Sequence, residues 1–139
     1  RICILSSGMT MDGLDQLTFL SRRVFSLRVK CAFSHPRGGH APWDEVERSA
    51  MLRAIPARQQ EFWAGRDAAR AAMSQLGVAP QPIAQRGDRS PHWPNGLTGS
   101  ISHCGSACIA AMAHTRDVRG LGVDLEEATG IEADLIDLI

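Results

Sequence analysis

The sequence contains no hydrophobic run long enough to cross a membrane. Its longest apolar run covers residues 107–113, far short of the roughly 20 residues that a transmembrane helix needs. The opening residues, RICILSSGM, also lack the basic region and sustained apolar stretch of a signal peptide. They lack an initiator methionine as well, so we expect the gene to begin upstream. No membrane-spanning segment and a cytoplasmic location are therefore expected.

Cysteine is too scattered to form a disulfide framework. The four cysteines are Cys3, Cys31, Cys104 and Cys108, and without an export signal they are expected to be reduced thiols. A zinc site built from His103, Cys104, Cys108 and His114 has one suitable spacing, but no second paired Cys/His cluster accompanies it. Buried structural cysteines in a hairpin are the main alternative.

Lysine is almost absent, and arginine carries nearly all the positive charge. The formal net charge is zero, with 44% hydrophobic and 22% charged residues, which indicates a globular chain. Basic residues exceed acidic ones in residues 1–89, and the reverse holds in residues 90–139. The basic part suits the binding of an anion, and the acidic part suits the binding of a metal ion. An ordinary mixed surface or arginine-rich codon usage explains the same pattern.

The order of the predicted elements indicates one domain with a modest core. We expect strands over Val24–Phe33, Leu97–Ser102, Ala107–His114 and Arg119–Ala128, and helices over Asp44–Arg53, Pro56–Leu76 and Ile131–Ile139. Gly77 is expected to end the long helix. Residues 78–96 contain four prolines and are expected to be mostly connection.

The long helix places two arginines beside its apolar stripe. At 100° per residue the stripe comprises Phe62, Ala69, Met73 and Leu76. Arg66 falls at its margin, and Arg70 lies one turn further along the same edge. A guanidinium at such a place extends to solvent, pairs with an acid, or holds a phosphate where the helix meets a sheet.

The segment RGLGVDLEEA, residues 119–128, places two carboxylates on one side of a strand. Asp124 and Glu126 are two residues apart and so share a face, whereas Glu127 points away. The pair suits Mg²⁺, which takes oxygen ligands and is often held by one or two carboxylates plus substrate phosphates. Gly120 and Gly122 would leave this face open for a bulky ligand. Solvated edge charges are the alternative.

The segment LTGSISHCGSAC, residues 97–108, brings hydroxyls and an imidazole to a strand end. Ser102 and His103 are suited to phosphate oxygens. A hydrolase nucleophile at Ser100 or Ser102 lacks the G-x-S-x-G elbow. In the preceding loop, Trp93 packs either on the edge of the core or against a flat ligand.

Three ordered segments together resemble one family. EFWAGRDAARAAMSQLG, RSPHWPNGLTGSISHC and GLGVDLE are similar to segments of the 4′-phosphopantetheinyl transferases, in the branch of the enterobactin-synthase and surfactin-synthetase activators. The resemblance runs from about Arg58 to Glu126. It implies transfer of the phosphopantetheine arm of coenzyme A to a serine of an acyl or peptidyl carrier protein, with Mg²⁺ as cofactor.

The resemblance also implies roles for individual residues. Asp124 and Glu126 would be the catalytic metal ligands. The coenzyme A phosphates would be bound by Arg58, Arg66, Arg70, Arg89, Ser102 and His103, with Arg58 and Arg70 as the weaker candidates. The glycines before Asp124 would leave room for the pyrophosphate. The expected partners are coenzyme A and a carrier protein, with no nucleic acid.

The resemblance implies an α+β fold that forms the first half of a pseudo-dimer, in which an antiparallel sheet packs with one long helix. Residues 1–118 would form this half and residues 119–139 the beginning of the second. The family's later W-x-x-K-E helix is missing, so a continuation of the chain or a partner is expected to supply it. We therefore expect weak or absent transferase activity from these 139 residues alone.

Two hypotheses from other classes remain open. One is a non-catalytic module that binds coenzyme A or a carrier protein. The other is an unrelated α/β structural domain in which Asp124 and Glu126 are surface charges.

Overall fold

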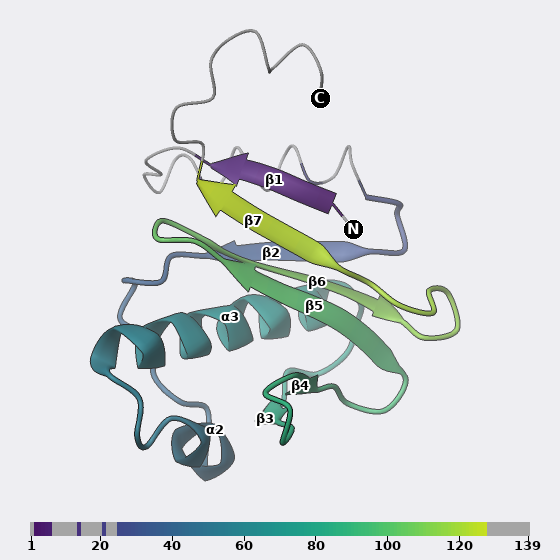
Figure 1. Cartoon of the computed structure of the whole chain (residues 1–139). Helices are drawn as coiled ribbons and strands as arrows, with labels where there is room; N and C mark the ends of the chain where they lie inside the picture. The colour runs from purple at the N-terminus through teal and green to yellow at the C-terminus, as the bar shows by residue number, and fades with distance from the viewer. Residues whose placement is uncertain (1, 7–13, 15–20, 22–24, 128–139) are drawn as a thin grey trace, which may run out of the picture.

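The computed structural model describes residues 2–6, 14, 21 and 25–127 (Figure 1). Its elements are β1 (Ile2–Ser6), β2 (Lys30–Ser34), α2 (Glu45–Ala50), α3 (Pro56–Gln75), β3 (Ala84–Gln85), β4 (Pro91–His92), β5 (Leu97–His103), β6 (Cys108–His114) and β7 (Val123–Glu127). The fold is α+β, with antiparallel sheets and one long helix, as predicted. Among the described helices, none has the length and apolar character needed to cross a bilayer.

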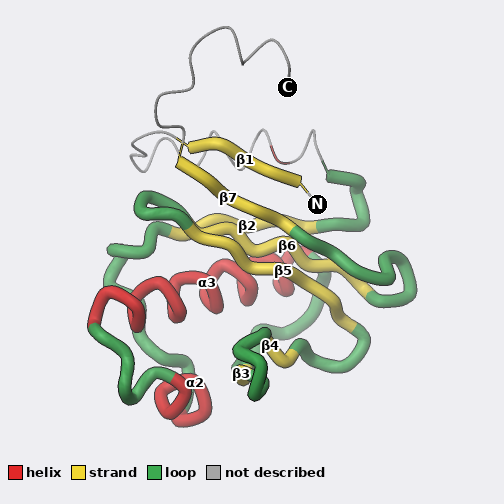
Figure 2. Tube along the Cα trace, in the orientation of Figure 1, coloured by secondary structure: helices red, strands yellow, loops and turns green. Residues whose placement is uncertain are grey.

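The described elements form three layers. The central sheet has the strand order β2-β6-β5, and both of its strand pairs are antiparallel. Helix α3 packs on one face of this sheet, and the β1-β7 pair lies over the other (Figures 1 and 2). Strand β5 lies at one edge of the central sheet, and it contacts both α3 and β7.

Strand β6 separates two hydrophobic clusters because its side chains alternate. Ala110 and Met112 belong to the cluster on the α3 side, whereas Ile109 and Ala111 belong to the cluster that includes Val123 of β7. Each of these β6 side chains is fully buried. A strand buried on both faces is a near-continuous apolar run, which accounts for the longest apolar run of the sequence.

Helix α3 has the boundaries that its sequence predicts. Pro56 occupies its first turn, where the missing N–H of proline removes no helical hydrogen bond. The predicted apolar stripe is confirmed, since Phe62, Ala69 and Met73 are buried. At the other end Gly77 has a φ of 76°, and its N–H donates to the Ser74 carbonyl. The N–H of the next residue reaches back to the carbonyl of Met73, which completes a Schellman motif.

Two predicted strands are shorter than expected. The predicted strand Val24–Phe33 is replaced by β2, which begins only at Lys30, after turns over residues 25–29. Strand β7 begins at Val123, so Gly120 and Gly122 precede it instead of sharing its face. The predicted helix Ile131–Ile139 lies outside the described residues.

Two short features were not predicted. Strand β1 pairs with β7 in parallel, with Cys3 opposite Asp124, so not every strand pair is antiparallel. This pairing joins the predicted first half to the strand beyond residue 118. The β3-β4 hairpin lies within residues 78–96, which were expected to be connection. It brings the Arg86–Ser90 turn near the central sheet, where it contributes to the site described below.

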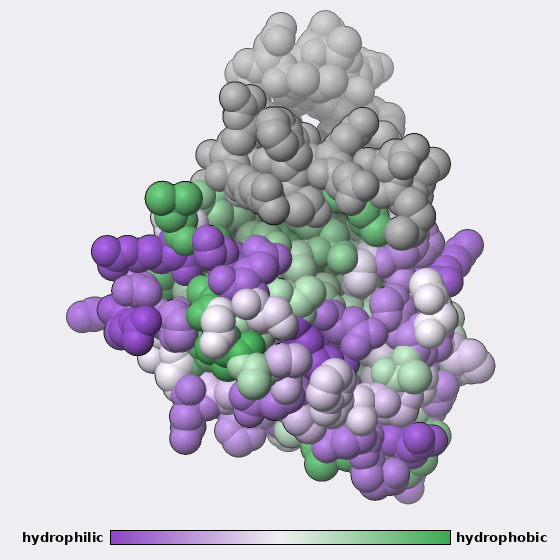
Figure 3. Space-filling model, turned by 180° about the vertical axis from the view of Figure 1, so that it is seen from behind, coloured by the Kyte–Doolittle hydropathy of each residue, from purple (hydrophilic) through white to green (hydrophobic). Residues whose placement is uncertain are grey.

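The surface carries hydrophobic side chains around α2. Exposed examples are Trp43, Val46, Leu52 and Ile55. Figure 3 shows hydrophobic groups interspersed among hydrophilic ones on the side of the molecule turned away in Figure 1.

Candidate functional site

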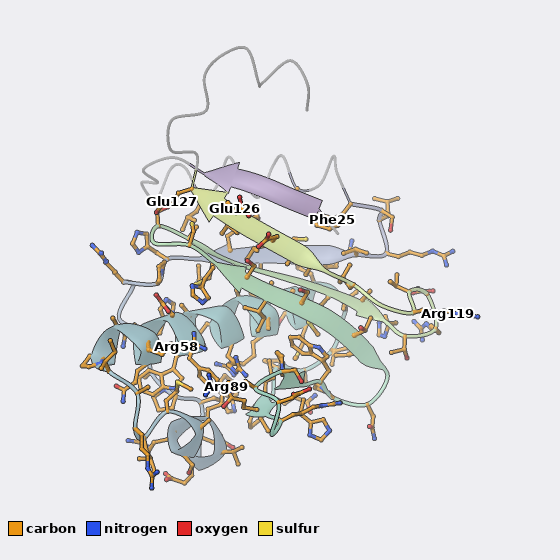
Figure 4. The ribbon with its side chains drawn as sticks, in the orientation of Figure 1. Phe25, Arg58, Arg89, Arg119, Glu126 and Glu127 are labelled. Atoms are coloured by element: carbon orange, nitrogen blue, oxygen red, sulfur yellow. The ribbon has the colours of Figure 1, made fainter. Side chains whose placement is uncertain are left out.

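A small basic pocket lies between α3, β5 and the β3-β4 hairpin. It has a volume of about 160 Å³, and its lining includes Arg58, Arg66, Arg89 and His103. These residues are separated by up to 45 positions in the sequence, and all were predicted to bind phosphate. Figure 4 shows Arg58 and Arg89 on the α3 side of the central sheet. The fold thus gathers four of the predicted site residues around one cavity.

Arg66 is the most buried member of this cluster. Only 5% of the residue is exposed. Its guanidinium carbon lies 3.5 Å from the centre of the Phe62 ring, and its Nε donates to the Ile83 carbonyl at 3.4 Å. Its Nη2 is buried and has no hydrogen-bond partner within the described part of the chain. Unpartnered buried charged groups are costly, so an anion in the pocket would be strongly favoured.

The pKa of Arg66 reflects this environment. Burial is the main cause that lowers it, to about 10, and the nearby positive charges of Arg58 and Arg70 lower it further. Glu47 acts in the opposite direction. Because desolvation outweighs the favourable carboxylate, Arg66 lacks full charge compensation in the folded chain.

Glu61 provides a negative charge at the wall of the same pocket. Its Oε2 lies 3.6 Å from Nη1 of Arg58 and 3.8 Å from Nδ1 of His103. The Nη1 of Arg58 is also 3.5 Å from Nε2 of His103. These separations are longer than those of strong charged hydrogen bonds. A phosphate with shorter contacts could therefore replace Glu61 as the partner of Arg58 and His103.

Arg89 reaches the pocket from a strained turn. Its φ of 72° lies in the left-handed region, which is uncommon for a residue with a side chain. Its N–H donates to the Arg86 carbonyl, and the Asp88 carboxylate accepts from both the N–H and the hydroxyl of Ser90. These bonds, the hydroxyl bond first, lower the pKa of Asp88. They hold the turn that presents Arg89.

Arg70 belongs to a different environment. Its guanidinium pairs with the fully buried Glu47 of α2 and with Asp67, the latter at 2.7 Å. It also lies 4.8 Å from the centre of the Trp43 ring. Arg70 does not line the basic pocket. The sequence left three roles open for Arg70: extension to solvent, pairing with an acid, or binding of phosphate. In the structure Arg70 pairs with acids.

Ser102 and His103 diverge because adjacent strand residues face opposite ways. His103 lines the pocket, whereas the Ser102 hydroxyl accepts from the Leu125 N–H at 3.0 Å and lies 3.4 Å from Oδ1 of Asp124. The two predicted ligand residues therefore connect two sites. The basic pocket lies on one side of β5, and the acidic strand lies on the other.

The side chains of β7 alternate between two faces, as the sequence predicts. Val123 and Leu125 are buried against the central sheet, while Asp124 is half-buried and Glu126 is exposed. Figure 4 shows Glu126 on β7, across β5 from Arg58. Two carboxylates on one strand face fit the oxygen preference of Mg²⁺. Among residues 2–6, 14, 21 and 25–127, no group of three His, Cys, Asp or Glu side chains could hold a metal ion.

The remaining candidates behave as structural residues. Cys31 and Cys108 are buried free thiols, and burial raises the pKa of each to about 12. The zinc cluster proposed as an alternative is not formed by the described residues. Trp93 packs against the hydrophobic cluster on the α3 side, which confirms the packing alternative.

Added Cβ atoms on Gly120 and Gly122 would meet nothing within 4 Å, so the space beside them is open.

Some residues of the site were not singled out from the sequence. Glu61 and Glu47 neutralise arginines of α3, but nothing in their local patterns reveals these partners. Ser100, which the sequence offered as a hydroxyl for phosphate or as a nucleophile, accepts a hydrogen bond from the Val123 N–H at 3.1 Å. Its spacing of two residues from Ser102 was the available signal, because both serines must face the same neighbour.

Comparison with known proteins agrees with the resemblance seen in the sequence. The family model of the 4′-phosphopantetheinyl transferase N-terminal domain matches residues 46–113. The 4′-phosphopantetheinyl transferase Svp of Streptomyces mobaraensis is 40% identical over 80 residues, which cover 58% of this chain and 32% of Svp. The transferase PptT of Mycobacterium tuberculosis is 34% identical over 93 residues, covering 67% of this chain and 41% of PptT.

A component of enterobactin synthase is also similar. Enterobactin synthase component D of Salmonella typhi is 41% identical over 87 residues, covering 58% of this chain and 35% of that protein. The chain thus spans well under half the length of each of these relatives. The matched region contains α3, β5 and the β3-β4 hairpin, which carry the basic pocket. The matched family model and these relatives support membership of the chain in the phosphopantetheinyl transferase superfamily.

Proposed function

We propose that this chain contributes the coenzyme A-binding part of an enzyme that transfers 4′-phosphopantetheine to a serine of an acyl or peptidyl carrier protein. The observation that carries the proposal is the basic pocket, in which Arg58, Arg66, Arg89 and His103 converge. The unpartnered Nη2 of Arg66 gives this pocket a specific demand for an anion. Coenzyme A carries several phosphates that would meet this demand.

In this proposal the pocket residues bind and orient the phosphates. Arg58 and Arg89 are exposed enough to reach an incoming ligand, while Arg66 supplies a fixed donor from the pocket wall. His103 contributes either a donor or an acceptor, depending on its tautomer. Phosphoryl transfer depends mainly on alignment and on neutralising charge, and a cluster of arginines serves both needs. Arg70 supports the pocket indirectly by holding α2 against α3.

We assign the metal site to Asp124 and Glu126. Both carboxylates lie on one face of β7, and Asp124 contacts Ser102, the neighbour of His103 in the chain. Bound Mg²⁺ would withdraw charge from the attacked phosphorus and from the departing bisphosphate. The open space beside Gly120 and Gly122 leaves room for the pyrophosphate next to this pair.

We further propose that the described fold is the first half of a two-part transferase, with β7 as the opening strand of the second half. The support for this division is that β7 has no backbone pairing with the described central sheet; β1 would be the strand of the first half that pairs across the boundary. Within a pseudo-dimer the active site would lie in the seam beside β7. The carrier protein would reach the pocket from this seam.

The test is calorimetric titration of the 139-residue chain with coenzyme A, with and without Mg²⁺. Wild type is expected to bind coenzyme A more tightly with Mg²⁺, and Asp124→Ala is expected to remove that enhancement. Glu127→Gln is a matched control, because it removes a neighbouring exposed charge that points away from the pair. Failure of the folded wild-type chain to bind coenzyme A at all would refute the proposal.

A second candidate is a non-catalytic module that binds coenzyme A. The position of the basic pocket on the side of β5 opposite Asp124 favours it, because the pocket residues could bind phosphates without the carboxylates. Coenzyme A binding that is indifferent to Mg²⁺ and to Asp124→Ala would support this module over the transferase.

A further inference from the structure

Two serine hydroxyls of β5 take the place of a backbone partner along one edge of β7. The Ser100 hydroxyl accepts from the Val123 N–H at 3.1 Å, and the Ser102 hydroxyl accepts from the Leu125 N–H at 3.0 Å. On its other edge β7 pairs with β1 through the backbone. Both serines lie on the face of β5 opposite Ile101, which packs against Gly65 of α3. The contacts thus join the central sheet to the strand that carries the acids.

The same hydroxyls, together with the contact between Ser102 and Asp124, are matched to one register of β7. Donors and acceptors both recur at every second residue, so the two bonds form together only when the same face of β7 is turned toward β5. A shift of one residue would turn Asp124 and Glu126 toward the hydrophobic cluster that now holds Val123 and Leu125. A shift of two residues would keep the parity but would separate Asp124 from Ser102.

Ser102 links this register to the orientation of a carboxylate. Its hydroxyl oxygen accepts from the Leu125 N–H, and its proton is directed to Oδ1 of Asp124 at 3.4 Å. One hydroxyl can make both bonds, because it has one donor and two acceptor lone pairs. Leu125 is buried, with 3% exposed, so its backbone donor sits where a lost partner is not readily replaced by water.

We propose that Ser100 and Ser102 form a hydroxyl clamp that fixes the register of β7 and thereby orients Asp124. Both serines are positioning residues in this role. Ser102 acts through Asp124 and not by contact with coenzyme A. The clamp itself does not require the proposed transferase activity, whereas its consequence for metal binding rests on that function.

Amide hydrogen exchange in the 139-residue chain tests the clamp directly. Ser100→Ala is expected to accelerate exchange at the Val123 amide about five- to tenfold, and Ser102→Ala to do the same at Leu125, as expected for loss of one hydrogen bond. The Ile109 amide of β6 should be unaffected, which shows that the chain remains folded. Ser100→Thr should restore protection at Val123, because it restores the hydroxyl.

Thr98→Val is the matched control. It removes a hydroxyl from the same face of β5, two residues before Ser100, and no hydrogen bond from Thr98 to β7 is described. It should leave both β7 amides unchanged. Unchanged exchange at Val123 and Leu125 in both serine variants would overturn the clamp, as would equal acceleration by Thr98→Val.

Titration with Mn²⁺, a paramagnetic substitute for Mg²⁺, tests the effect on the acids. Ser102→Ala is expected to weaken Mn²⁺ binding several-fold, and Thr98→Val to leave it unchanged. If exchange accelerates while Mn²⁺ affinity is unchanged, the role of the clamp in orienting Asp124 is overturned. If Asp124→Ala itself leaves Mn²⁺ binding intact, the proposed metal site fails, and the exchange measurement still decides the clamp.

Discussion

The buried pair between Glu47 and Arg70 gives the sharpest stability prediction. Glu47 is fully buried, and its Oε2 accepts from Arg70 and from the N–H of Ile83, the latter at 2.9 Å. One side chain therefore ties α2 to α3 and to the segment before β3. Glu47→Gln keeps the size of the side chain but removes its charge. Asp67, whose side chain is 38% exposed, is then the remaining carboxylate partner of Arg70.

Removing one partner of a buried ion pair costs about 3 to 5 kcal/mol. A domain of this size has a free energy of unfolding of about 5 to 15 kcal/mol, so Glu47→Gln removes a large share of it. With a urea dependence of about 2 kcal/mol per molar, the unfolding midpoint should fall by about 2 M. Equilibrium unfolding in urea, followed by tryptophan fluorescence, measures this change.

Glu45→Gln is the control for this experiment. Glu45 lies in the same helix and pairs with Arg48 at 3.4 Å, but both side chains are largely exposed. Exposed pairs contribute about 0 to 1 kcal/mol, so the midpoint should barely move. A loss of less than about 1 kcal/mol in Glu47→Gln, comparable with the control, would contradict the assignment of Arg70 to a structural pair.

Three further predictions concern packing, thiols and charge. Gly65→Ala should cost about 1 to 3 kcal/mol in urea unfolding, because its Cβ would lie 2.7 Å from Cγ2 of Ile101; unchanged stability would contradict close packing of α3 on β5. Burial raises the pKa of Cys31 and Cys108 to about 12. The free energy of unfolding should therefore fall as the pH rises from about 9 to 12, because only the unfolded thiols ionise in this range. Alkylation of the thiols at pH 8 that is as fast in the folded chain as in urea would refute their burial. Glu61→Gln should tighten binding of adenosine 3′,5′-bisphosphate about two- to fivefold in calorimetry, because it removes a like charge; weaker binding would show that Glu61 assists the ligand.

The parts of the fold that local sequence determines were predictable. Pro56, the apolar stripe and Gly77 define α3 within the chain itself. The β5-β6 hairpin follows from two strand-like runs joined by a short turn. The buried face of β7 was also predictable. Val123 and Leu125 are both buried because every second side chain of a pleated strand points to the same face.

The features that depend on distant partners were not predictable. Strand β1 pairs with a strand about 120 residues away, and a short isolated strand gives little local signal. The sequence around Arg70 does not show whether this residue binds a phosphate or pairs with Glu47, because its role depends on where α2 packs against α3. The sequence shows that Ser102 and His103, as adjacent residues of a strand, face opposite sides. It does not show which of the two sides faces the arginines.

The central claim is that the basic pocket binds phosphate, and one titration tests it most directly. Adenosine 3′,5′-bisphosphate is added to the 139-residue chain, to Arg58→Ala, and to Arg28→Ala, an exposed arginine paired with Asp117 at 3.2 Å outside the pocket. Loss of one charged contact to phosphate should weaken binding about tenfold in Arg58→Ala, while Arg28→Ala should match wild type. Equal affinities in all three proteins, or no binding by the folded wild-type chain, would contradict the account.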